Sequence, residues 1–268
     1  MIEEIAKQIQ KKINGYRPET LIILGSGLGT MADEIINPII IPYKDIKGFP
    51  VSTATGHKGQ LIVGRLEGKD VICMQGRFHI FEGYAPQTIN TVIKAFQVLG
   101  IKNLIVTNAS GSLNKNIPAN SIMLITDHIN FPDINPLVGP NDEKYGPRFP
   151  SQNDSYTAKF QEKLKKVAQK NKIKIYEGVY IMVSGPTFET KAEAKAFAIL
   201  GADAVGMSTI PEVISATHSG MKILGLSCVT NMGAGLQSHA PSHKETLLSG
   251  KIVAVELTIL IKGFLKEL

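Results

Sequence analysis

The sequence predicts an α/β fold with a largely buried sheet. Short apolar runs typical of strands alternate along the chain with longer segments in which apolar residues recur at helical spacing. The 268 residues are 43% hydrophobic, which is enough to bury a substantial core. No Pro/Ser-rich linker, charge block or internal repeat interrupts the chain. These observations allow either one large domain or two small ones.

The elements can be placed in order along the chain. Strands are predicted at residues 21–25, 61–66, 71–75, 104–108, 122–127, 175–183, 203–207 and 223–230. Helices are predicted at residues 2–13, 87–99, 155–170, 190–200, 211–219 and 243–266. Three of the helix starts have capping-box spacing, with Ser or Thr followed by Glu: Thr190 with Glu193, Thr209 with Glu212, and Ser242 with Glu245.

Charge gives a weak indication of the ligand. The net charge of +6 comes from 29 basic and 23 acidic residues, which favours anionic ligands without being a nucleic-acid signature. Seven lysines between Lys159 and Lys174 surround an apolar stripe of Phe160, Leu164 and Val167. We interpret them as the solvated face of a helix, with a polyanion site as the alternative. The sequence predicts no nucleic-acid partner.

Cysteine usage and hydropathy indicate a cytoplasmic protein. Cys73 and Cys228 lie in apolar strand-like runs without metal-binding spacing, so we expect reduced core residues. The longest apolar tract, residues 252–265, is broken by Glu256 and Lys262 and is too short to cross a bilayer. The N-terminal segment has an amphipathic helical pattern and lacks the form of a signal peptide. We expect no membrane partner.

Five predicted strands end in small or hydrogen-bonding residues. In open α/β sheets, ligands bind beyond the carboxyl ends of the strands. The residues at these five ends are Ser26, Arg77, Ala109, Ser208 and Asn231. We therefore predict one composite site.

The first strand end is rich in glycine. Gly25 and Gly27 flank Ser26, but Thr30 stands where a dinucleotide fingerprint needs its third glycine. A phosphate loop that ends in Gly-Lys-Ser/Thr is also absent from the sequence. Ser26 is interpreted as a donor to a small anion, with a structural glycine turn as the alternative.

Arg77 and His79 follow the strand at residues 71–75. In an extended chain, residues two apart point to the same side, so the guanidinium and imidazole converge. The planar donors of arginine fit a phosphate. The alternative is a surface arginine paired with Glu82, which the surrounding apolar residues disfavour.

Glu189 and Ser208 lie at two consecutive corners. Glu189 precedes the helix predicted at residues 190–200, and Ser208 lies between a strand and the next helix, where free N–H groups attract anions. Taken alone, the two residues are explained equally well without a ligand, Glu189 as a solvated acid and Ser208 as a turn residue. Ala109 and Gly111 could likewise expose backbone N–H groups to a ligand or form a simple turn.

The last part of the site lies near the C-terminus. Asn231 ends a strand, and its amide can donate to and accept from a heterocycle. The capping box at Ser242 places His243 in the first turn of the last helix. His239 and His243 have four-residue spacing, but no Glu follows the first His as in zinc proteases. We predict no metal site.

Several motifs, in order along nearly the whole chain, resemble the trimeric class of purine nucleoside phosphorylases. They are GSGLG at 25–29, GHKG at 56–59, QGRFHIFEGY at 75–84, TNASGSLN at 107–114, GPNDEKYGPRFP at 139–150, GPTFET at 185–190 and GADAVGMSTIPEV at 201–213. The resemblance implies one α/β domain over residues 1–268, with a central mixed, twisted sheet flanked by helices.

The resemblance also implies a reaction and roles for the matched residues. The family phosphorolyses purine ribonucleosides and deoxyribonucleosides to the base and the sugar 1-phosphate, reversibly and in purine salvage, with inorganic phosphate as a co-substrate and no cofactor. Phosphate would be held by Ser26, His57, Arg77, His79, Ala109 and Ser208. The purine would be held by Phe188, Glu189 and Asn231, and the ribose by Phe81, Met207, His243 and Phe149 from the neighbouring subunit of a homotrimer. The residues expected to act in catalysis are Asn231, Glu189, His79 and His243.

The chemistry of these residue types fits phosphorolysis independently. Cleaving an N-glycosidic bond needs an anion held against an electron-poor sugar, and hydrogen bonds that strengthen as the base gains charge. An ionised Glu189 accepts from N1–H of hypoxanthine or guanine, whereas adenine offers a lone pair there. We therefore predict inosine and guanosine as substrates, with adenosine poor.

Three departures and three alternatives accompany the resemblance. Phe81 stands where vertebrate members have Tyr, Met232 replaces a Lys, and the loop at residues 131–135 is shorter, which affects the contact around Phe149.

A methylthioadenosine phosphorylase is an alternative, but that branch has Ser and Asp in place of Glu189 and Asn231. A dinucleotide-dependent oxidoreductase and a non-catalytic purine or phosphate sensor are the remaining alternatives.

Overall fold

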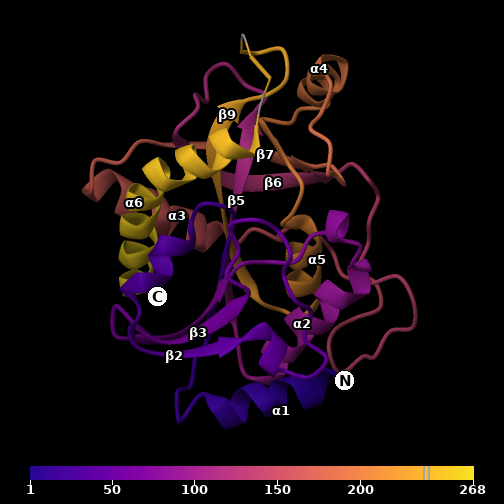
Figure 1. The fold of residues 1–268 in the computed structure, drawn as a ribbon, viewed down its shortest axis with the longest axis vertical. Coiled ribbons are helices and arrows are strands. Elements are labelled where there is room, and N and C mark those ends of the chain that lie inside the picture. The colour runs from indigo at the N-terminus through magenta and orange to yellow at the C-terminus, as the bar shows by residue number, and fades with distance from the viewer. Residues whose placement is uncertain (238, 241) are drawn as a thin grey trace.

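A computed structural model of the protein describes residues 1–237, 239–240 and 242–268. It has an α/β architecture built on one nine-stranded sheet (Figure 1). The strands are β1 (Thr20–Leu24), β2 (Ile36–Pro42), β3 (Gln60–Leu66), β4 (Lys69–Gln75), β5 (Asn103–Ser112), β6 (Ser121–Asn130), β7 (Ile175–Met182), β8 (Ala204–Gly206) and β9 (Lys222–Met232). The helices are α1 (Ile2–Lys12), α2 (Pro86–Val98), α3 (Ala158–Lys170), α4 (Lys191–Ile199), α5 (Ile210–His218) and α6 (His243–Glu267).

The predicted helices and strands are all present, and the structure adds β2. This strand carries Pro38 and Pro42, which lack the N–H that a ladder needs, and most of its residues are exposed or half-buried. It lies at the edge of the sheet, where it pairs with β3. Proline is tolerated at such an edge, and the two prolines interrupt the isoleucine run that would otherwise predict a strand.

The sheet is mixed, as predicted, and it closes on itself at one end. The strand order is β2-β3-β4-β1-β5-β8-β7-β6-β9, and β9 also pairs with β5 in parallel. Strands β5, β8, β7, β6 and β9 therefore form a closed ring, whereas β2, β3, β4 and β1 form an open sheet that extends from β5. This ring was not part of the prediction.

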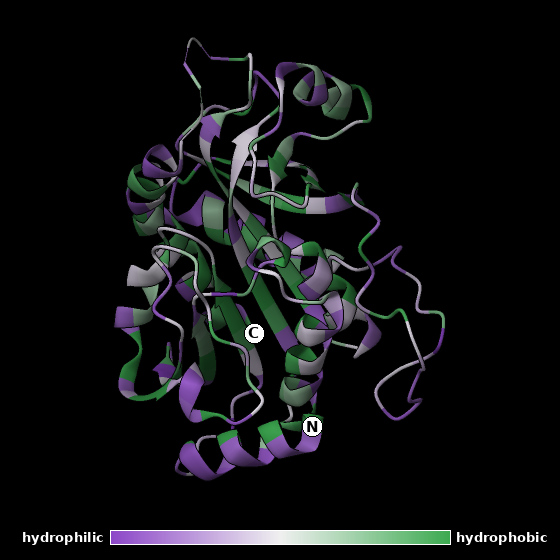
Figure 2. Ribbon diagram, turned by 45° about the vertical axis from the view of Figure 1, so that its right-hand side comes forward, coloured by the Kyte–Doolittle hydropathy of each residue, from purple (hydrophilic) through white to green (hydrophobic). Residues whose placement is uncertain are grey.

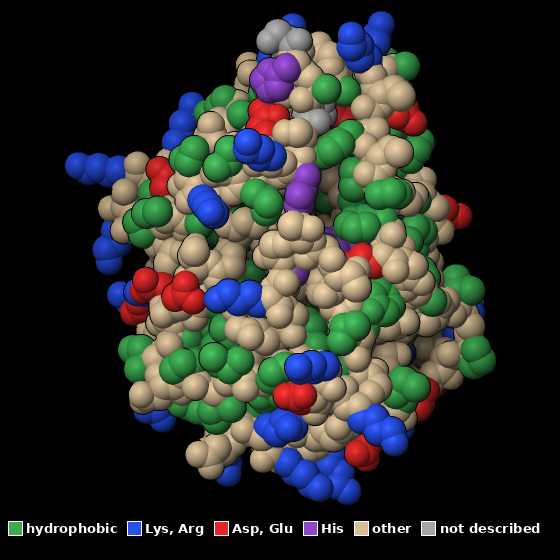
Figure 3. Space-filling view, in the orientation of Figure 1, with side chains coloured by type: hydrophobic (Ala, Val, Ile, Leu, Met, Phe, Trp, Pro, Cys, Tyr) green, Lys and Arg blue, Asp and Glu red, His purple; other side chains and the backbone are tan. Residues whose placement is uncertain are grey.

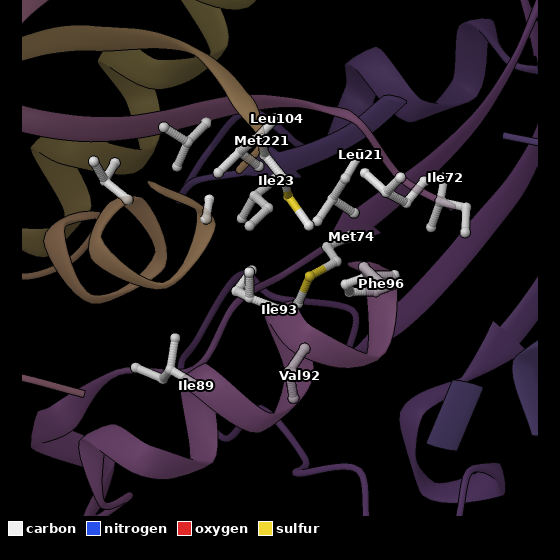
Figure 4. Packing of buried hydrophobic residues seen from close by; sticks show 14 of the residues in the cluster. Leu21, Ile23, Ile72, Met74, Ile89, Val92, Ile93, Phe96, Leu104 and Met221 are labelled. Atoms are coloured by element: carbon white, nitrogen blue, oxygen red, sulfur yellow. The ribbon is translucent and has the colours of Figure 1, made fainter. Parts of the chain in front are cut away.

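Helices cover both faces of the sheet. In β1, Leu21 and Ile23 belong to one apolar cluster with α1, α2 and α5, whereas Ile22 and Leu24 belong to a second with α3 and α6. Figure 4 shows this first cluster, with Leu21 and Ile23 of β1 on one side, Ile93 of α2 on the other and Met74 between them. In Figure 2 the central strands are largely hydrophobic, whereas α1 is mostly hydrophilic. Burial on both faces explains the continuous apolar runs of these strands.

Other predictions about the surface and core can be compared directly. Phe160, Leu164 and Val167 of α3 are buried, so the lysines around them lie on the outer side of this helix. Cys73 and Cys228 are free and buried. Within the described residues, no helix is long and apolar enough to cross a bilayer, and no cluster of three or more potential metal ligands occurs in that part of the chain.

Candidate active site

A cavity of about 300 Å³ lies beyond the carboxyl ends of the strands. It is bounded by the segments after β1, β4, β7 and β8, by the second half of β5, by the end of β9 and by the start of α6. Its lining comprises Gly25, Ser26, Ala54, Thr55, Arg77, His79, Phe81, Ala109, Ser110, Gly111, Val183, Pro186, Phe188, Glu189, Val205, Gly206, Met207, Ser208, Thr230, Asn231, His243 and Thr246. All predicted site residues except His57 and Phe149 are in this lining. In Figure 3, histidine side chains lie near the centre of the face shown.

The cavity opens where β5 changes partners. Residues 103–106 of β5 pair with β1, and Gly111 and Ser112 pair with β8. Between them, Thr107 to Ser110 have neither neighbour on that edge in the described structure. Such a splitting point leaves backbone groups free to meet a ligand, and Ala109 lies within it. Gly111, by contrast, pairs with β8 on this edge, and it also lines the cavity.

Arg77 is a buried cation at one end of the cavity. Its side chain is 1% exposed, and its Nε donates to Glu212 Oε1 at 2.9 Å. Its Nη1 donates to the carbonyl oxygen of Thr107 at 2.6 Å and to Ser208 Oγ at 3.2 Å. Nη2 is buried without a hydrogen-bond partner among the described residues. A buried guanidinium N–H without an acceptor is costly, so this atom is suited to an anionic ligand.

The carboxylate partner of Arg77 differs from the one in the alternative reading. The alternative reading paired Arg77 with Glu82, but the structure pairs it with Glu212, in the first turn of α5. Glu212 therefore does not cap its helix, and Thr209 makes no side-chain cap bond, so this capping box is absent. The box at Thr190 and Glu193 is confirmed. A buried ion pair across two elements outweighs a local cap because both charges would otherwise be unpaired.

His79 is held by Glu82. Its Nδ1 lies 2.7 Å from Glu82 Oε1. Burial opposes ionisation of Glu82, but hydrogen bonds from His79 and Thr53 lower the pKa of this carboxyl to about 2. An ionised carboxylate only accepts hydrogen bonds, so Nδ1 carries a proton and Nε2 is left for a ligand. The ring of Phe81 stacks on His79 with centroids 4.5 Å apart.

His57 supports the site from behind the lining. Its Nδ1 accepts the backbone N–H of Arg77 at 3.1 Å, and its Nε2 lies 3.2 Å from Ser26 Oγ. We assign the proton to Nε2, which makes His57 a donor to Ser26. Burial, and then the charge of His79, lower the pKa of His57 to about 4. His57 is thus neutral at neutral pH and contributes no charge of its own.

Replacing His57 with glutamine is expected to weaken the pH dependence of stability between about pH 6.5 and pH 4. The unfolded chain protonates His57 near pH 6.5, whereas the folded protein does so only at about pH 4. The wild type therefore loses stability as the pH falls through this window, by up to about 3 kcal/mol. Urea unfolding of both proteins at pH 7 and pH 4.5 in phosphate-free buffer measures the difference. Equal losses in the two proteins would contradict the expectation.

The glycines around Ser26 serve close packing. A Cβ at Gly25 would lie 2.8 Å from the Cα of Asn108, and one at Gly27 would lie 3.2 Å from the Cα of Gly250 in α6. Gly27 also has a φ of +79°. Both glycines let the end of β1 pass tightly between β5 and α6, which fixes where Ser26 lies.

The other end of the cavity carries a carboxylate and an amide. Glu189 Oε1 accepts the backbone N–H of Ala234 at 2.9 Å, and Oε2 has no partner among the described residues. Asn231 is 4% exposed. Its Oδ1 accepts from Thr230 Oγ1 at 3.0 Å, and its Nδ2 uses one hydrogen on the carbonyl of Met232 at 2.9 Å. Phe188, adjacent in sequence to Glu189, is 40% exposed and lines the same end.

The middle of the cavity is lined by Met207, Phe81 and His243. The Sδ of Met207 would lie 2.6 Å from a Cβ at Gly185, so this glycine lets the methionine pack against the loop before Glu189. His243 begins α6, and its Nε2 lies 3.4 Å from the carbonyl oxygen of Thr55. Ser242 caps this helix as predicted, but Glu245 contacts His239 and leaves the capping box half formed.

Sequence reasoning did not single out several polar or small lining residues, including Ser110 and Gly206. The others are Ala54, Thr55, Thr230 and Thr246. Thr246 lies one helical turn after His243, so helical spacing was a usable signal for it. The loop at residues 54–55 has no comparable pattern, because only the tertiary fold brings it to the start of α6.

Phe149 does not reach this cavity within its own chain. It is 86% exposed and borders a separate hollow with Asn135, Val138 and Arg148. The guanidinium of Arg148 lies 5.2 Å from its ring centroid.

The cavity thus has a buried guanidinium with an unpartnered N–H at one end and a carboxylate and an amide at the other, and it lies at the splitting point of an α/β sheet. This arrangement is of the kind that a phosphorylase requires, with a place for an anion and a place for a base. The profile of the phosphorylase superfamily matches residues 19–266, and the chain belongs to this superfamily. It is 48% identical to purine nucleoside phosphorylase 1 of Bacillus subtilis over 250 residues, which cover 93% of this chain and 89% of the relative. It is 43% identical to purine nucleoside phosphorylase 1 of Geobacillus stearothermophilus over 100% of this chain and 97% of the relative.

Solved structures give the same result for the fold. The purine nucleoside phosphorylase of Schistosoma mansoni in complex with adenosine superposes with a TM-score of 0.95 at 39% identity, covering 100% of this chain and 96% of the other. The same enzyme in complex with inosine gives a TM-score of 0.94 at 38% identity, with the same coverage. The predicted fold and the resemblance to purine nucleoside phosphorylases are confirmed.

Proposed function

We propose that the protein catalyses the reversible phosphorolysis of purine nucleosides, giving the free base and the sugar 1-phosphate in purine salvage. The observation that carries this proposal is the buried, unpartnered Nη2 of Arg77 in the same cavity as Glu189 and Asn231. One end offers donors to an anion, and the other offers a carboxylate and an amide to a heterocycle. The names of the relatives support the same activity.

The geometry suggests how the reaction proceeds. Phosphate would lie among Arg77, His79, Ser26, Ser208 and the backbone of Ala109, with one oxygen facing C1′ of the sugar. Holding two reactants in this way can lower the barrier by about 7–11 kcal/mol at the favourable limit. As the glycosidic bond breaks, phosphate attacks C1′ and the purine leaves with the bonding electron pair.

The leaving purine would be stabilised at the other end of the cavity. The second Nδ2 hydrogen of Asn231 would be donated to N7, and this bond strengthens as the base gains charge. His243 and Met207 would contact the sugar between the two ends. Inorganic phosphate is the co-substrate, and this chemistry calls for neither a covalent nucleophile nor a cofactor.

The experiment is to follow inosine consumption by the purified protein with and without phosphate. The expected result is hypoxanthine and ribose 1-phosphate, formed only when phosphate is present. Hypoxanthine with free ribose, independent of phosphate, would mean hydrolysis and would reject the assignment of the anion site. Turnover of methylthioadenosine alone would favour the alternative phosphorylase, and base binding without turnover would favour a sensor.

Inosine is expected to be turned over far better than adenosine, by up to about 10⁴-fold in kcat/KM. Glu189 Oε1 is held by the Ala234 N–H, so Oε2 is available to accept from N1–H of a 6-oxopurine. Adenine would place a lone pair against this oxygen. Steady-state kinetics with both nucleosides measure the ratio, and the Glu189→Gln variant, whose amide can donate to N1 of adenine, should reduce it. Comparable rates for the two nucleosides in the wild type would contradict this role of Glu189.

We also propose a homotrimer in which Phe149 enters a neighbouring subunit's site. Its exposure supports this, because a phenylalanine ring that is 86% exposed leaves a large apolar area in water. Phe149→Ala should raise KM for the nucleoside while leaving KM for phosphate unchanged. An unchanged nucleoside KM would reject this assignment. The free, buried cysteines support the expected cytoplasmic location.

A further inference from the structure

Ser208, Thr209 and Ile210 form a strained turn beside the anion-binding end. Thr209 has a φ of 82° and a ψ of −50°, and the N–H of Ile210 donates to the carbonyl oxygen of Ser208 at 3.0 Å. This is a γ-turn with positive φ, which is rare and strained, particularly for a β-branched residue. Such a conformation persists only when its surroundings hold it in place.

A line of buried hydrogen bonds holds the side chain of Thr209. Asn108 Nδ2 donates to Thr209 Oγ1 at 2.9 Å, and Asn108 Oδ1 accepts from Ser227 Oγ at 2.6 Å. Ser227 Oγ lies 2.6 Å from Ser110 Oγ. Asn108 is 1% exposed, and Thr209 and Ser227 are fully buried. The line continues to Ser208, whose Oγ lies 3.1 Å from Thr209 Oγ1.

The chemistry of the partners fixes the direction of these bonds. Asn108 Nδ2 can only donate, so Thr209 Oγ1 accepts from it. Among the described residues, Ser208 Oγ is the one acceptor within reach of the Thr209 hydrogen, so Thr209 donates to Ser208. Arg77 Nη1 can also only donate, and it too donates to Ser208 Oγ. Both lone pairs of Ser208 Oγ are then occupied. Only its hydrogen remains, and Ser208 lines the cavity.

We propose that Asn108 and Thr209 are positioning residues that orient the Ser208 hydroxyl as a donor to the phosphate. This inference rests on the proposed function for the identity of the anion. Without the Thr209 hydroxyl, the Ser208 hydroxyl can rotate so that its hydrogen points away from the ligand. The fraction of Ser208 hydroxyls that donate to the phosphate is then lower. Neither Asn108 nor Thr209 lines the cavity, so their effect is exerted through Ser208.

A matched pair of variants at Thr209 tests the proposal. Thr209→Val keeps the branched shape and loses the hydroxyl, whereas Thr209→Ser keeps the hydroxyl. We expect Thr209→Val to raise KM for phosphate by about tenfold, in line with the loss of a hydrogen bond to a charged group. KM for inosine should change by less than about twofold in the same variant. Thr209→Ser should behave like the wild type.

The outcomes separate positioning from a merely structural role. An unchanged phosphate KM in folded Thr209→Val, or equal changes in both KM values, would overturn the proposal. If Thr209→Val does not fold, Asn108→Ala is expected to show the same selective loss. If the wild type shows no phosphate-dependent turnover, the proposed function fails. The inference is then tested by the increase in Tm that inorganic phosphate causes. This increase should be smaller in Thr209→Val than in the wild type and in Thr209→Ser.

Discussion

Replacing Asn231 with alanine is expected to lower kcat/KM for inosine by about 10²–10³-fold. Removing one donor aimed at charge that develops in the transition state typically has an effect of this size. Asn231 is suited to such a role because its amide is buried, lines the cavity and is oriented by Thr230 and the carbonyl of Met232. Most of the loss should be in kcat, because the bond to N7 is stronger in the transition state than in the bound substrate.

The measurement is steady-state kinetics with inosine and phosphate varied separately. KM for phosphate should stay within about twofold of the wild type, because Asn231 lies at the base-binding end. A suitable control is Gln237→Ala, which removes a nearby amide that accepts the Met232 N–H but does not line the cavity. If the control loses as much activity as Asn231→Ala, the effect comes from the loop and not from a contact to the purine.

Replacing Arg77 with methionine is expected to abolish phosphate binding and to destabilise the fold by about 3–5 kcal/mol. Methionine keeps much of the apolar volume but leaves the Glu212 carboxylate buried without its cation. Removing one partner of a buried ion pair has a cost of this size because an uncompensated charge remains in the interior. Activity should fall in the same variant, since the free Nη2 donor is lost.

A double variant separates the two effects. Arg77→Met combined with Glu212→Gln removes both charges, so most of the unfolding free energy should return while phosphate binding stays lost. Urea unfolding and phosphate titration measure the two quantities. Lys165→Met, which breaks the exposed pair with Glu177, is the control and should lower stability by less than about 1 kcal/mol. Recovery of phosphate binding in the double variant would show that Arg77 is not the anion-binding group.

Much of the fold was predictable because burial leaves a periodic signal. Leu21 to Leu24 are buried on both faces of the sheet and read as a continuous apolar run. The strand Ile36–Pro42 was not predicted, because Pro38 and Pro42 interrupt its isoleucines, which an edge strand tolerates. The pairing of β5 with β9, which closes the ring, also could not be predicted from the sequence. Strand pairing depends on the three-dimensional arrangement of the chain, and the sequence of a single buried strand does not indicate which strand lies beside it.

The site residues that could be predicted are those at the ends of apolar strands. Ser26, Arg77 and Asn231 were found because each follows an apolar run, and the cavity brings them together. Their partners were harder to predict, since Glu82 and Glu212 are both plausible carboxylates for Arg77 by residue type. Only the packing of α5 against the sheet selects Glu212. The role of Thr209 was equally hidden, because its backbone conformation cannot be read from a Thr-Ile-Pro sequence.

The closed ring has a consequence for the order in which parts of the protein open. Every ring strand is bonded on both sides, so no ring strand can separate without breaking two ladders. Asn231 and Ala109 are carried by this slow-opening unit, whereas Thr55 and His243 lie on exposed segments that meet across the cavity mouth. Amide exchange should therefore be fastest around residues 53–58 and slowest in β5 and β9. Nucleosides would enter and leave past these exposed segments, while the proposed catalytic group Asn231 stays fixed on the ring.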